Sequence, residues 1–195
     1  MSNEINVIKR NGDKDPLNLE KVHKMVEHAC EGLAGVSASQ VEISSGIQFF
    51  DGIKTSQIQE ILVRSASDLI SLETPNYQYV ASRLLLFDLR KQLNNHYEDH
   101  PFILDHVKKC ADLDVYDKTI IKKYSEEEWK QIDSYIDYGR DYLFSYAGMR
   151  QVVDKYLVQD RSSGELYETP QQMYIMIAAT LFQEYPQETR LDYVR

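Results

Sequence analysis

The sequence predicts a mostly α-helical protein in which an N-terminal β-hairpin lies over a four-helix bundle. The first observation behind this prediction is the pair Asn11-Gly12, which tolerates positive φ and follows an alternating apolar stretch at residues 5–8. The second is a set of four amphipathic segments between residues 20 and 96, bounded by capping or turn residues. We expect a first domain at residues 1–96 and a second, helical domain at residues 97–195.

The predicted hairpin brings positive charge next to the start of a helix. Its first strand runs into Lys9 and Arg10, and its second contains Pro16, which confines that strand to a sheet edge. Asn18 then stands where a helix N-cap belongs, and Lys21 lies three positions further on. Backbone N–H groups at a helix N-terminus attract anions, so Lys9, Arg10 and Lys21 can converge on an anion there. The alternative is a solvated hairpin with ordinary surface lysines.

The four segments after the hairpin show the i, i+3, i+4 spacing of helices that bury one face. The second of them is expected to end at Phe49-Phe50. The residues expected to bound the segments are Gly32 and Gly35 after the first, a capping box of Ser37 and Gln40 before the second, Thr55 or Ser56 before the third, and Thr74-Pro75 before the fourth.

Residues 97–195 carry further helix signals and most of the tyrosines. The expected elements are a helix near residues 103–111, a helix after a capping box of Ser125 and Glu128, a helix at residues 143–157, a turn between two extended pieces at residues 158–168, a helix after Thr169-Pro170, and a last helix after Pro186. The helix after Pro170 is expected to pack through a stripe of Tyr174, Ile177, Ala178 and Leu181.

Composition limits the classes of function. The 22 basic and 31 acidic side chains give a net charge of −9, which argues against general nucleic-acid binding. Any phosphate site must therefore be a local basic pocket. The sequence has no run of 18 apolar residues for a membrane span and no apolar signal-peptide region at its start, so we expect a cytoplasmic protein.

The two cysteines, Cys30 and Cys110, form no CxxC pair and indicate neither a zinc site nor a disulfide framework. We expect both to be small buried hydrophobic residues. No metal ligands are predicted anywhere in the chain.

Several motifs resemble a known regulatory domain. The pattern VxKRxG at residues 7–12 is followed by NLxKxH at 18–23, FFDGIKT at 49–55, PNYQYVASRL at 75–84 and LRK at 89–91. Together they resemble an ATP-cone, the small nucleotide-binding domain at the N-terminus of many ribonucleotide reductase large subunits. In the second half, FSYAGM at 144–149, KYLV at 155–158, SGELYETPQ at 163–171 and ETRLDYV at 188–194 resemble the helical region that follows it in those subunits.

The resemblance implies an allosteric site for ATP or dATP, bound with Mg²⁺. Lys9, Arg10, Lys21, Thr55 and Lys91 match family residues that face the nucleotide, mostly its phosphates. Asp15 and Asn18 match residues that face the adenine, whose amino group needs an acceptor; the family usually has Glu at the first of these positions.

Val7 and Phe49 would line the base pocket under the same resemblance. For Phe49, a plain core position is an equally good interpretation. For Thr55, the alternative is a helix cap, and a capping hydroxyl beside exposed N–H groups can do both jobs.

Two positions depart from the form of the family that dATP inhibits. That form commonly has histidine where this chain has Gln59 and Asp88. Asp88 interrupts an apolar run and lies three positions before Lys91, with which it can pair on one helical face. Within the site it would repel phosphate, by about 4 kcal/mol at 4 Å and an effective dielectric constant of 20. The resemblance therefore implies a nucleotide site, and we expect it to discriminate dATP more weakly than members that have histidines at these two positions.

As a whole, the resemblance implies the allosteric N-terminal part of a class I ribonucleoside-diphosphate reductase large subunit, followed by an incomplete helical domain. The intact enzyme makes deoxyribonucleotides for DNA synthesis through a thiyl radical, with a small radical-bearing subunit and a second large subunit as partners. The family's catalytic cysteines lie in a barrel, and none of those motifs is present in residues 1–195. We therefore expect no catalytic residue and no reductase activity in this chain alone.

Two alternatives remain. One is a non-enzymatic nucleotide sensor, such as the ATP-cone transcriptional repressors, which carry clustered cysteines in a zinc ribbon. This chain has no such cluster. The other is an anaerobic-class reductase, which also carries a cone; the motifs at residues 144–194 favour the aerobic class.

Overall fold

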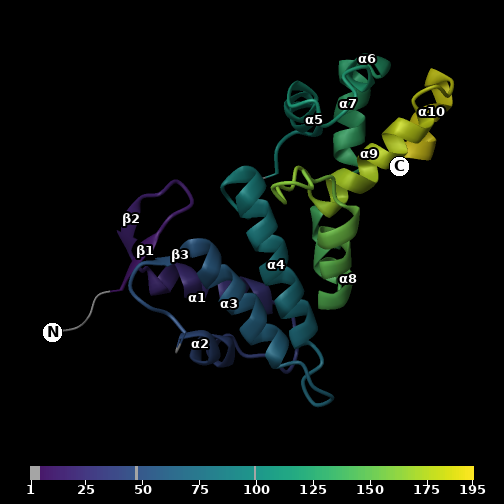
Figure 1. The fold of residues 1–195 in the computed structure, drawn as a ribbon. Helices are drawn as coiled ribbons and strands as arrows, with labels where there is room; N and C mark the ends of the chain where they lie inside the picture. Colours follow the sequence, from purple (N-terminus) through teal and green to yellow (C-terminus); the bar gives the residue numbers. More distant parts are fainter. Residues whose placement is uncertain (1–4, 47, 99) are drawn as a thin grey trace. The chain divides into compact units, whose positions relative to one another are not determined.

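The computed structural model describes residues 5–46, 48–98 and 100–195, which divide into two compact units. Unit 1 comprises the described residues up to Asp88 together with residues 142–150, and unit 2 comprises residues 89–141 and 151–195. The chain is mostly helical with one small sheet, as the sequence predicts (Figure 1). The expected domain boundary near residue 96 stays a prediction. No helix of the described ranges is long and apolar enough to cross a membrane.

Unit 1 contains the hairpin and the four helices expected after it (Figure 1). Its elements are β1 (Asn6–Ile8), β2 (Lys14–Pro16), α1 (Leu19–Cys30), α2 (Ala38–Gly46), β3 (Ile53–Lys54), α3 (Thr55–Asp68) and the first part of α4 (Tyr77–Asn94), joined by most of α8 (Tyr146–Gln151).

The turn of the hairpin depends on a single glycine. Gly12 donates to the carbonyl of Lys9 at 3.0 Å, and Lys9 donates to the carbonyl of Asp13 at 2.8 Å. Only Gly12 takes positive φ, at +89°, while the Asn11 side chain accepts a hydrogen bond from the Asp13 amide. This is a three-residue loop with glycine in the left-handed conformation, so the pair Asn11-Gly12 does make the predicted hairpin, through one positive-φ residue rather than two.

The sheet has a third strand that the sequence did not predict. Its order is β2-β1-β3, with β1 antiparallel to β2 and parallel to β3. The carboxylate of Asp51 accepts from both the backbone and the side-chain amide of Asn6, which anchors β3 beside β1. A two-residue strand after an Asp-Gly turn shows no alternation of polarity, so it left no periodic signal.

The start of α2 differs from the predicted capping box. The Ser37 amide donates to the Tyr77 hydroxyl at 2.9 Å, and that hydroxyl donates to the side chain of Gln40 at 2.6 Å. A distant tyrosine on α4 therefore takes the place that a local Ser37–Gln40 pair would have filled. The helix also ends at Gly46, before the expected Phe49-Phe50.

The starts of α3 and α4 also shift. Thr55 is the first residue of α3 and not its cap; the Gln57 side chain accepts from the Lys54 amide at 3.0 Å instead. Helix α4 begins at Tyr77 rather than directly after Thr74, and the Thr74 hydroxyl donates back to the carbonyl of Leu69. The α4 face predicted to be apolar is buried as expected.

Unit 2 confirms two local helix starts. Ser125 and Glu128 form the predicted capping box of α7, and Thr169 with Gln172 forms one at α9. The elements are the end of α4, α5 (Ile103–Asp112), α6 (Ile120–Lys123), α7 (Glu126–Ser134), most of the 3₁₀ helix η1 (Tyr138–Leu143), the π-helical turn η2 (Val152–Tyr156), α9 (Pro170–Phe182) and α10 (Gln187–Val194). The helix expected at residues 143–157 is thus divided among η1, α8 and η2.

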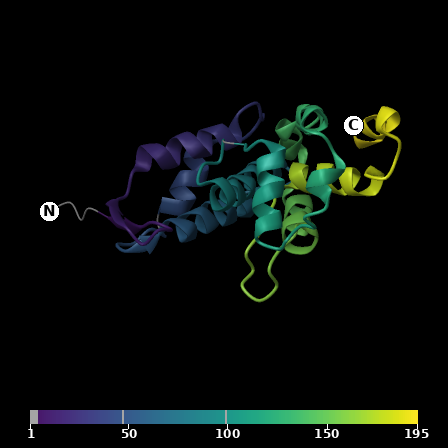
Figure 2. The ribbon, with the colours of Figure 1, turned by 90° about the horizontal axis from the view of Figure 1, so that it is seen from above.

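The turn expected between η2 and α9 is present. Gln159 and Leu166 form an antiparallel bridge, and Gly164 at the tip has φ of +75°. Figure 2 shows it as a projecting loop in the yellow-green part of the chain.

The predicted packing stripe of α9 is wrong. Tyr174, Ile177 and Leu181 are all exposed, whereas Ile175, Met176 and Ala179 are buried in the apolar core of unit 2 with α5, α7 and α10. The helix is apolar on nearly all sides, so its sequence alone does not distinguish the buried face.

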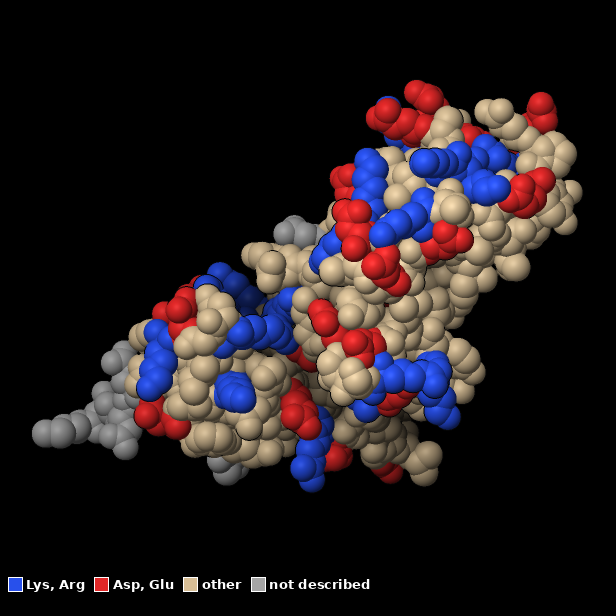
Figure 3. All heavy atoms as spheres, turned by 45° about the horizontal axis from the view of Figure 1, so that its top comes forward, with Lys and Arg blue, Asp and Glu red and all other residues tan. Residues whose placement is uncertain are grey.

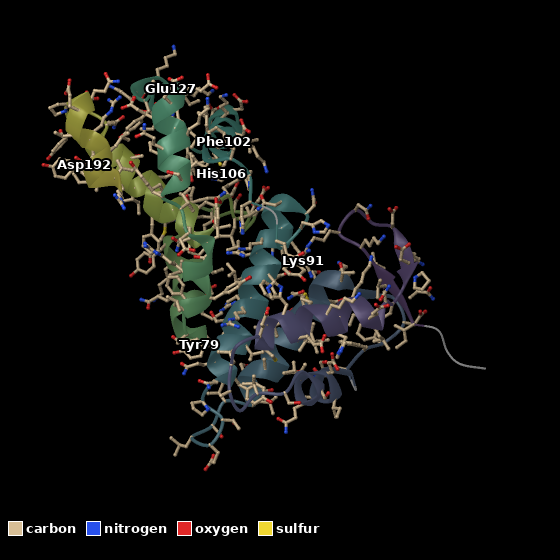
Figure 4. The ribbon with its side chains drawn as sticks, turned by 180° about the vertical axis from the view of Figure 1, so that it is seen from behind. Tyr79, Lys91, Phe102, His106, Glu127 and Asp192 are labelled. Atoms are coloured by element: carbon tan, nitrogen blue, oxygen red, sulfur yellow. The ribbon has the colours of Figure 1, made fainter. Side chains whose placement is uncertain are left out.

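Unit 2 also contains a largely buried polar cluster, formed by α5, the segment after it and the segment before α9. The hydroxyl of Tyr116 donates to the Glu168 carboxylate and lies 3.4 Å from Nε2 of His106. Burial, with a smaller contribution from Lys109, lowers the pKa of His106 to about 4, and burial raises the pKa of the Glu168 carboxyl. His106, labelled in Figure 4, is therefore neutral in the folded protein near pH 7.

We predict that Tyr77→Phe destabilises the protein by about 1–2 kcal/mol, because the partly buried Ser37 amide and the Gln40 side chain lose their shared partner. Tyr79→Phe is the matched control, since it removes a hydroxyl two residues further along the same helix from a side chain that is only partly buried. Urea unfolding followed by circular dichroism measures both. Equal stability of the two variants would contradict the bridging role.

We predict that His106 makes the protein less stable as the pH falls from about 6.5 to about 4, because the unfolded chain then binds a proton that the folded chain does not. The full effect is about 3 kcal/mol and levels off below pH 4. Comparing unfolding of the wild type and His106→Gln at pH 7 and pH 4.5 checks it: the variant's disadvantage should shrink at the lower pH.

His23 provides a control of opposite sign. Hydrogen bonding to Glu42 raises the pKa of His23, so the stability that it contributes is present below pH 6.5 and lost as the pH rises through the folded value. His23→Gln should therefore lower the stability of the fold most at acidic pH. If the His23 and His106 variants showed the same pH trend, the opposite pKa shifts of the two histidines would be contradicted.

Candidate functional site

The residues expected at a nucleotide site lie mainly on the hairpin and on the helix starts next to it. Lys9 and Arg10 follow β1 directly, Asp15 lies in β2, and Lys21 lies in the first turn of α1. Thr55 is the first residue of α3, which β3 leads into. Figure 1 shows the hairpin beside the N-terminal ends of α1 and α3, so strand pairing is what brings these positions together.

Lys9 and Asp15 form an ion pair on one face of the hairpin. Asp15 is the register partner of Val7, and Lys9 lies two residues after Val7, so all three side chains share a face. The pair is about half exposed, at 48% and 47%. The hydrogen bond to Asp15 raises the pKa of Lys9, which keeps its ammonium charged.

Arg10 pairs with Asp88 of α4, 78 positions away in the sequence. Asp88 is only 19% exposed and follows the buried residues Leu86 and Phe87. The sequence offered Lys91 as a partner of Asp88, and the structure shows an ion pair with Arg10. The place of Asp88 beside the nucleotide phosphates stays a prediction.

The start of α1 is built as predicted. The side-chain oxygen of Asn18 accepts from the Lys21 amide at 2.9 Å, and Asn18 has the extended backbone typical of a cap. Its side-chain NH₂ group is not used by the cap and remains available for a ligand acceptor. Lys21 is exposed, and among the described residues no ion pair holds it.

The apolar residues of the proposed base pocket lie in two different surroundings. Val7 is 5% exposed and lies between Asp15 and Ile53 in the sheet. Phe49 is partly buried and borders a groove of about 500 Å³ whose lining includes Leu19 of α1 and Ile43 of α2. Both assignments to the base pocket stay predictions.

Gln59 and Lys91 have definite partners. Gln59 is 3% exposed, and its side-chain amide donates to the carbonyl of Leu84 at 2.9 Å, so it joins α3 to α4 inside unit 1. Lys91 lies in the part of α4 that belongs to unit 2, with its ammonium 5.2 Å from the ring centre of Tyr97. In Figure 4, Lys91 and Tyr79 lie toward opposite ends of that helix.

Two residues that shape the site escaped the sequence reasoning. Asp51 fixes β3 through Asn6, and this backbone hydrogen bond lowers the pKa of its carboxyl. Gln57 closes the start of α3. In the sequence, the Asp51-Gly52 turn was the one feature that pointed to Asp51. No sequence feature pointed to Gln57.

Charges of both signs alternate over the surface that Figure 3 shows. Unit 1 contributes three cations to the candidate site, namely Lys9, Arg10 and Lys21, and two carboxylates, Asp15 and Asp88. Their sum is one positive charge, on a chain with a net charge of −9. The site is therefore a small, net positive region on an acidic protein.

Comparison with known proteins gives two family matches. Residues 5–92 match the ATP cone domain, and residues 142–195 match the ribonucleotide reductase all-alpha domain. The first match contains every residue considered above for the nucleotide site.

The chain is also similar over its length to ribonucleoside-diphosphate reductase subunits alpha. It is 48% identical to that of Haemophilus influenzae and 49% identical to subunit 1 alpha of Escherichia coli, covering 100% of this chain and 26% of each relative. Identity to the subunit alpha of enterobacteria phage T4 is 40%, over 97% of this chain and 25% of that relative. The chain therefore spans about a quarter of the length of these relatives.

We predict that Asn18→Ala destabilises unit 1 by about 1 kcal/mol, because the Lys21 amide loses its capping acceptor. Asn18→Asp is the matched control: it keeps the accepting oxygen and should retain wild-type stability. Denaturant unfolding of the three proteins tests this. An equal loss in both variants would show that the cap is not what Asn18 contributes.

Proposed function

This chain carries an ATP cone domain followed by the all-alpha domain of ribonucleotide reductase, and from this premise we propose that it binds ATP or dATP as an allosteric effector. The observation that carries the proposal is the cluster formed by Lys9, Arg10 and the capped start of α1. It is a local source of positive charge and of backbone donors within the matched domain.

The phosphates fit the cationic side of the site. ATP carries roughly four negative charges without a metal, and Lys9, Arg10 and Lys21 are the groups that can form charge-assisted hydrogen bonds to them. The first-turn N–H groups of α1 and α3 would add donors. Lys91 is the fourth cation that the proposal assigns to the phosphates. Mg²⁺ would accompany the nucleotide on its phosphate oxygens, which are the hard ligands that this ion prefers.

The base is assigned to the carboxylate of Asp15 in β2 and the side-chain amide of Asn18 at the start of α1. Asp15 can accept from the adenine amino group, and the side-chain NH₂ of Asn18 can donate to a ring nitrogen. Guanine presents a carbonyl oxygen where adenine presents that amino group, so the Asp15 carboxylate would disfavour it. We therefore propose selectivity for adenine nucleotides.

Discrimination between ATP and dATP should be weak. Gln59 is committed to the Leu84 carbonyl, and Asp88 is committed to Arg10. We propose that this site binds both nucleotides with similar affinity.

The relatives are named ribonucleoside-diphosphate reductase subunits, and we propose the same activity for the complete protein. Its proposed partners are a small radical-bearing subunit and a second large subunit. The chain itself supplies no reducing pair. Burial raises the pKa of both Cys30 and Cys110 to about 11, so both are protonated thiols near pH 7, and they belong to different units. We therefore propose that residues 1–195 contribute regulation, and not catalysis, to the complete protein.

A nucleotide-sensing regulator outside any enzyme is the second candidate. The cone would serve it equally well, but the continuation into the all-alpha domain of ribonucleotide reductase favours the enzyme. The two readings agree on nucleotide binding.

We predict that Lys21→Ala weakens ATP binding by about 1.5–3 kcal/mol, the usual contribution of a charge-assisted hydrogen bond. Lys24→Ala is the matched control, because Lys24 lies one turn along the same helix and pairs with Glu20. Calorimetric titration of the whole chain with MgATP measures both. Equal affinity of the two variants would remove Lys21 from the phosphate site, and absence of wild-type binding at millimolar ATP would refute the proposal.

A further inference from the structure

Both hairpin cations of the proposed nucleotide site are held by carboxylates of unit 1. Lys9 pairs with Asp15, which lies diagonally across the hairpin, opposite Val7. Arg10 pairs with Asp88, which reaches it from a different helix. The second pair is the more enclosed, with Asp88 only 19% exposed, so solvent screens it less.

A guanidinium binds carboxylate and phosphate oxygens with the same donors and the same geometry. Arg10 donates to Asp88 through Nη2, one of the groups that it would offer to a phosphate. The carboxylate therefore occupies part of the surface on which the nucleotide phosphates depend. A neutral side chain at position 88 would leave those donors to the ligand.

We propose that Asp88 is an internal competitor for the nucleotide phosphates: it holds Arg10 in the nucleotide-free chain and must release it when a nucleotide binds. This inference rests on the proposed function, because it concerns the same site. It implies that the affinity of this site is set below what its cations would otherwise provide. It also implies that nucleotide binding exchanges a contact between the hairpin and α4 for one between the hairpin and the ligand.

The charges of the site indicate that a phosphate competes with Asp88 for Arg10 and is not simply attracted to a free cation. Of the three unit 1 cations, two are paired and Lys21 alone is exposed without an ion pair in the described residues. A phosphate that binds at Arg10 without displacing Asp88 would lie beside a carboxylate that is partly shielded from water. Separation of the Arg10–Asp88 pair is therefore a step of binding.

The test is calorimetric titration of the full chain with MgATP. Asp88→Asn should bind ATP about tenfold more tightly than the wild type, because an amide holds Arg10 less strongly than a carboxylate does. Asp88→Ser should shift affinity in the same direction, which separates the loss of charge from any new contact of the amide. Asp68→Asn, which neutralises an exposed carboxylate on α3, is the matched control and should leave affinity unchanged.

A double variant separates competition from long-range repulsion. In an Arg10→Gln background, the gain from Asp88→Asn should fall to about twofold or less, since the carboxylate then no longer withholds the Arg10 guanidinium from the phosphates. An undiminished tenfold gain in that background would overturn the proposal, as would wild-type ATP binding that Asp88→Asn does not strengthen. If neither the wild type nor the Asp88 variants bind ATP, the proposed function itself is wrong.

Discussion

Unit 1 depends on the pairing of one short strand with two neighbours. β1 is three residues long, yet it forms hydrogen bonds with β2 on one side and β3 on the other. Val7 at its centre is buried against Ile53, and Asn6 holds Asp51 at the strand's start. Because the charged residues Lys9 and Arg10 follow this strand directly, the position of β1 fixes where they can reach.

The helices are held to each other by polar side chains that reach over long sequence separations. Tyr77 bridges the start of α2, and Arg83 donates to the carbonyls of Ala29 and Glu31 at the end of α1. Each satisfies backbone groups that a helix end leaves unpaired. The fourth helix thus supports the C-terminal end of α1 and the start of α2.

The acidic character of the chain shapes its basic site. A cluster of cations on a protein with a net charge of −9 is surrounded by carboxylates, and two of them pair with the cations of the hairpin. We propose that such pairs hold the cations in place without a ligand and lower the affinity of the site for phosphate.

The sequence by itself determined the features that depend on residues a few positions apart. The glycine turn of the hairpin, the Asn18 cap and the capping boxes at Ser125 and Thr169 were all predictable, because each is made within about four residues. The motifs also pointed to a nucleotide-binding domain, whose family the comparisons confirm. The roles of individual site residues stay predictions.

Tertiary structure alone decided which partners those residues take. The third strand, the Tyr77 bridge that replaced a local capping box, the buried face of α9 and the Arg10–Asp88 pair all join segments distant in the sequence. Local propensity and periodicity do not encode such contacts, because they arise only when packing brings two elements together. For the candidate site, the sequence therefore named the charged groups, and the fold determined that carboxylates of the same chain hold two of them.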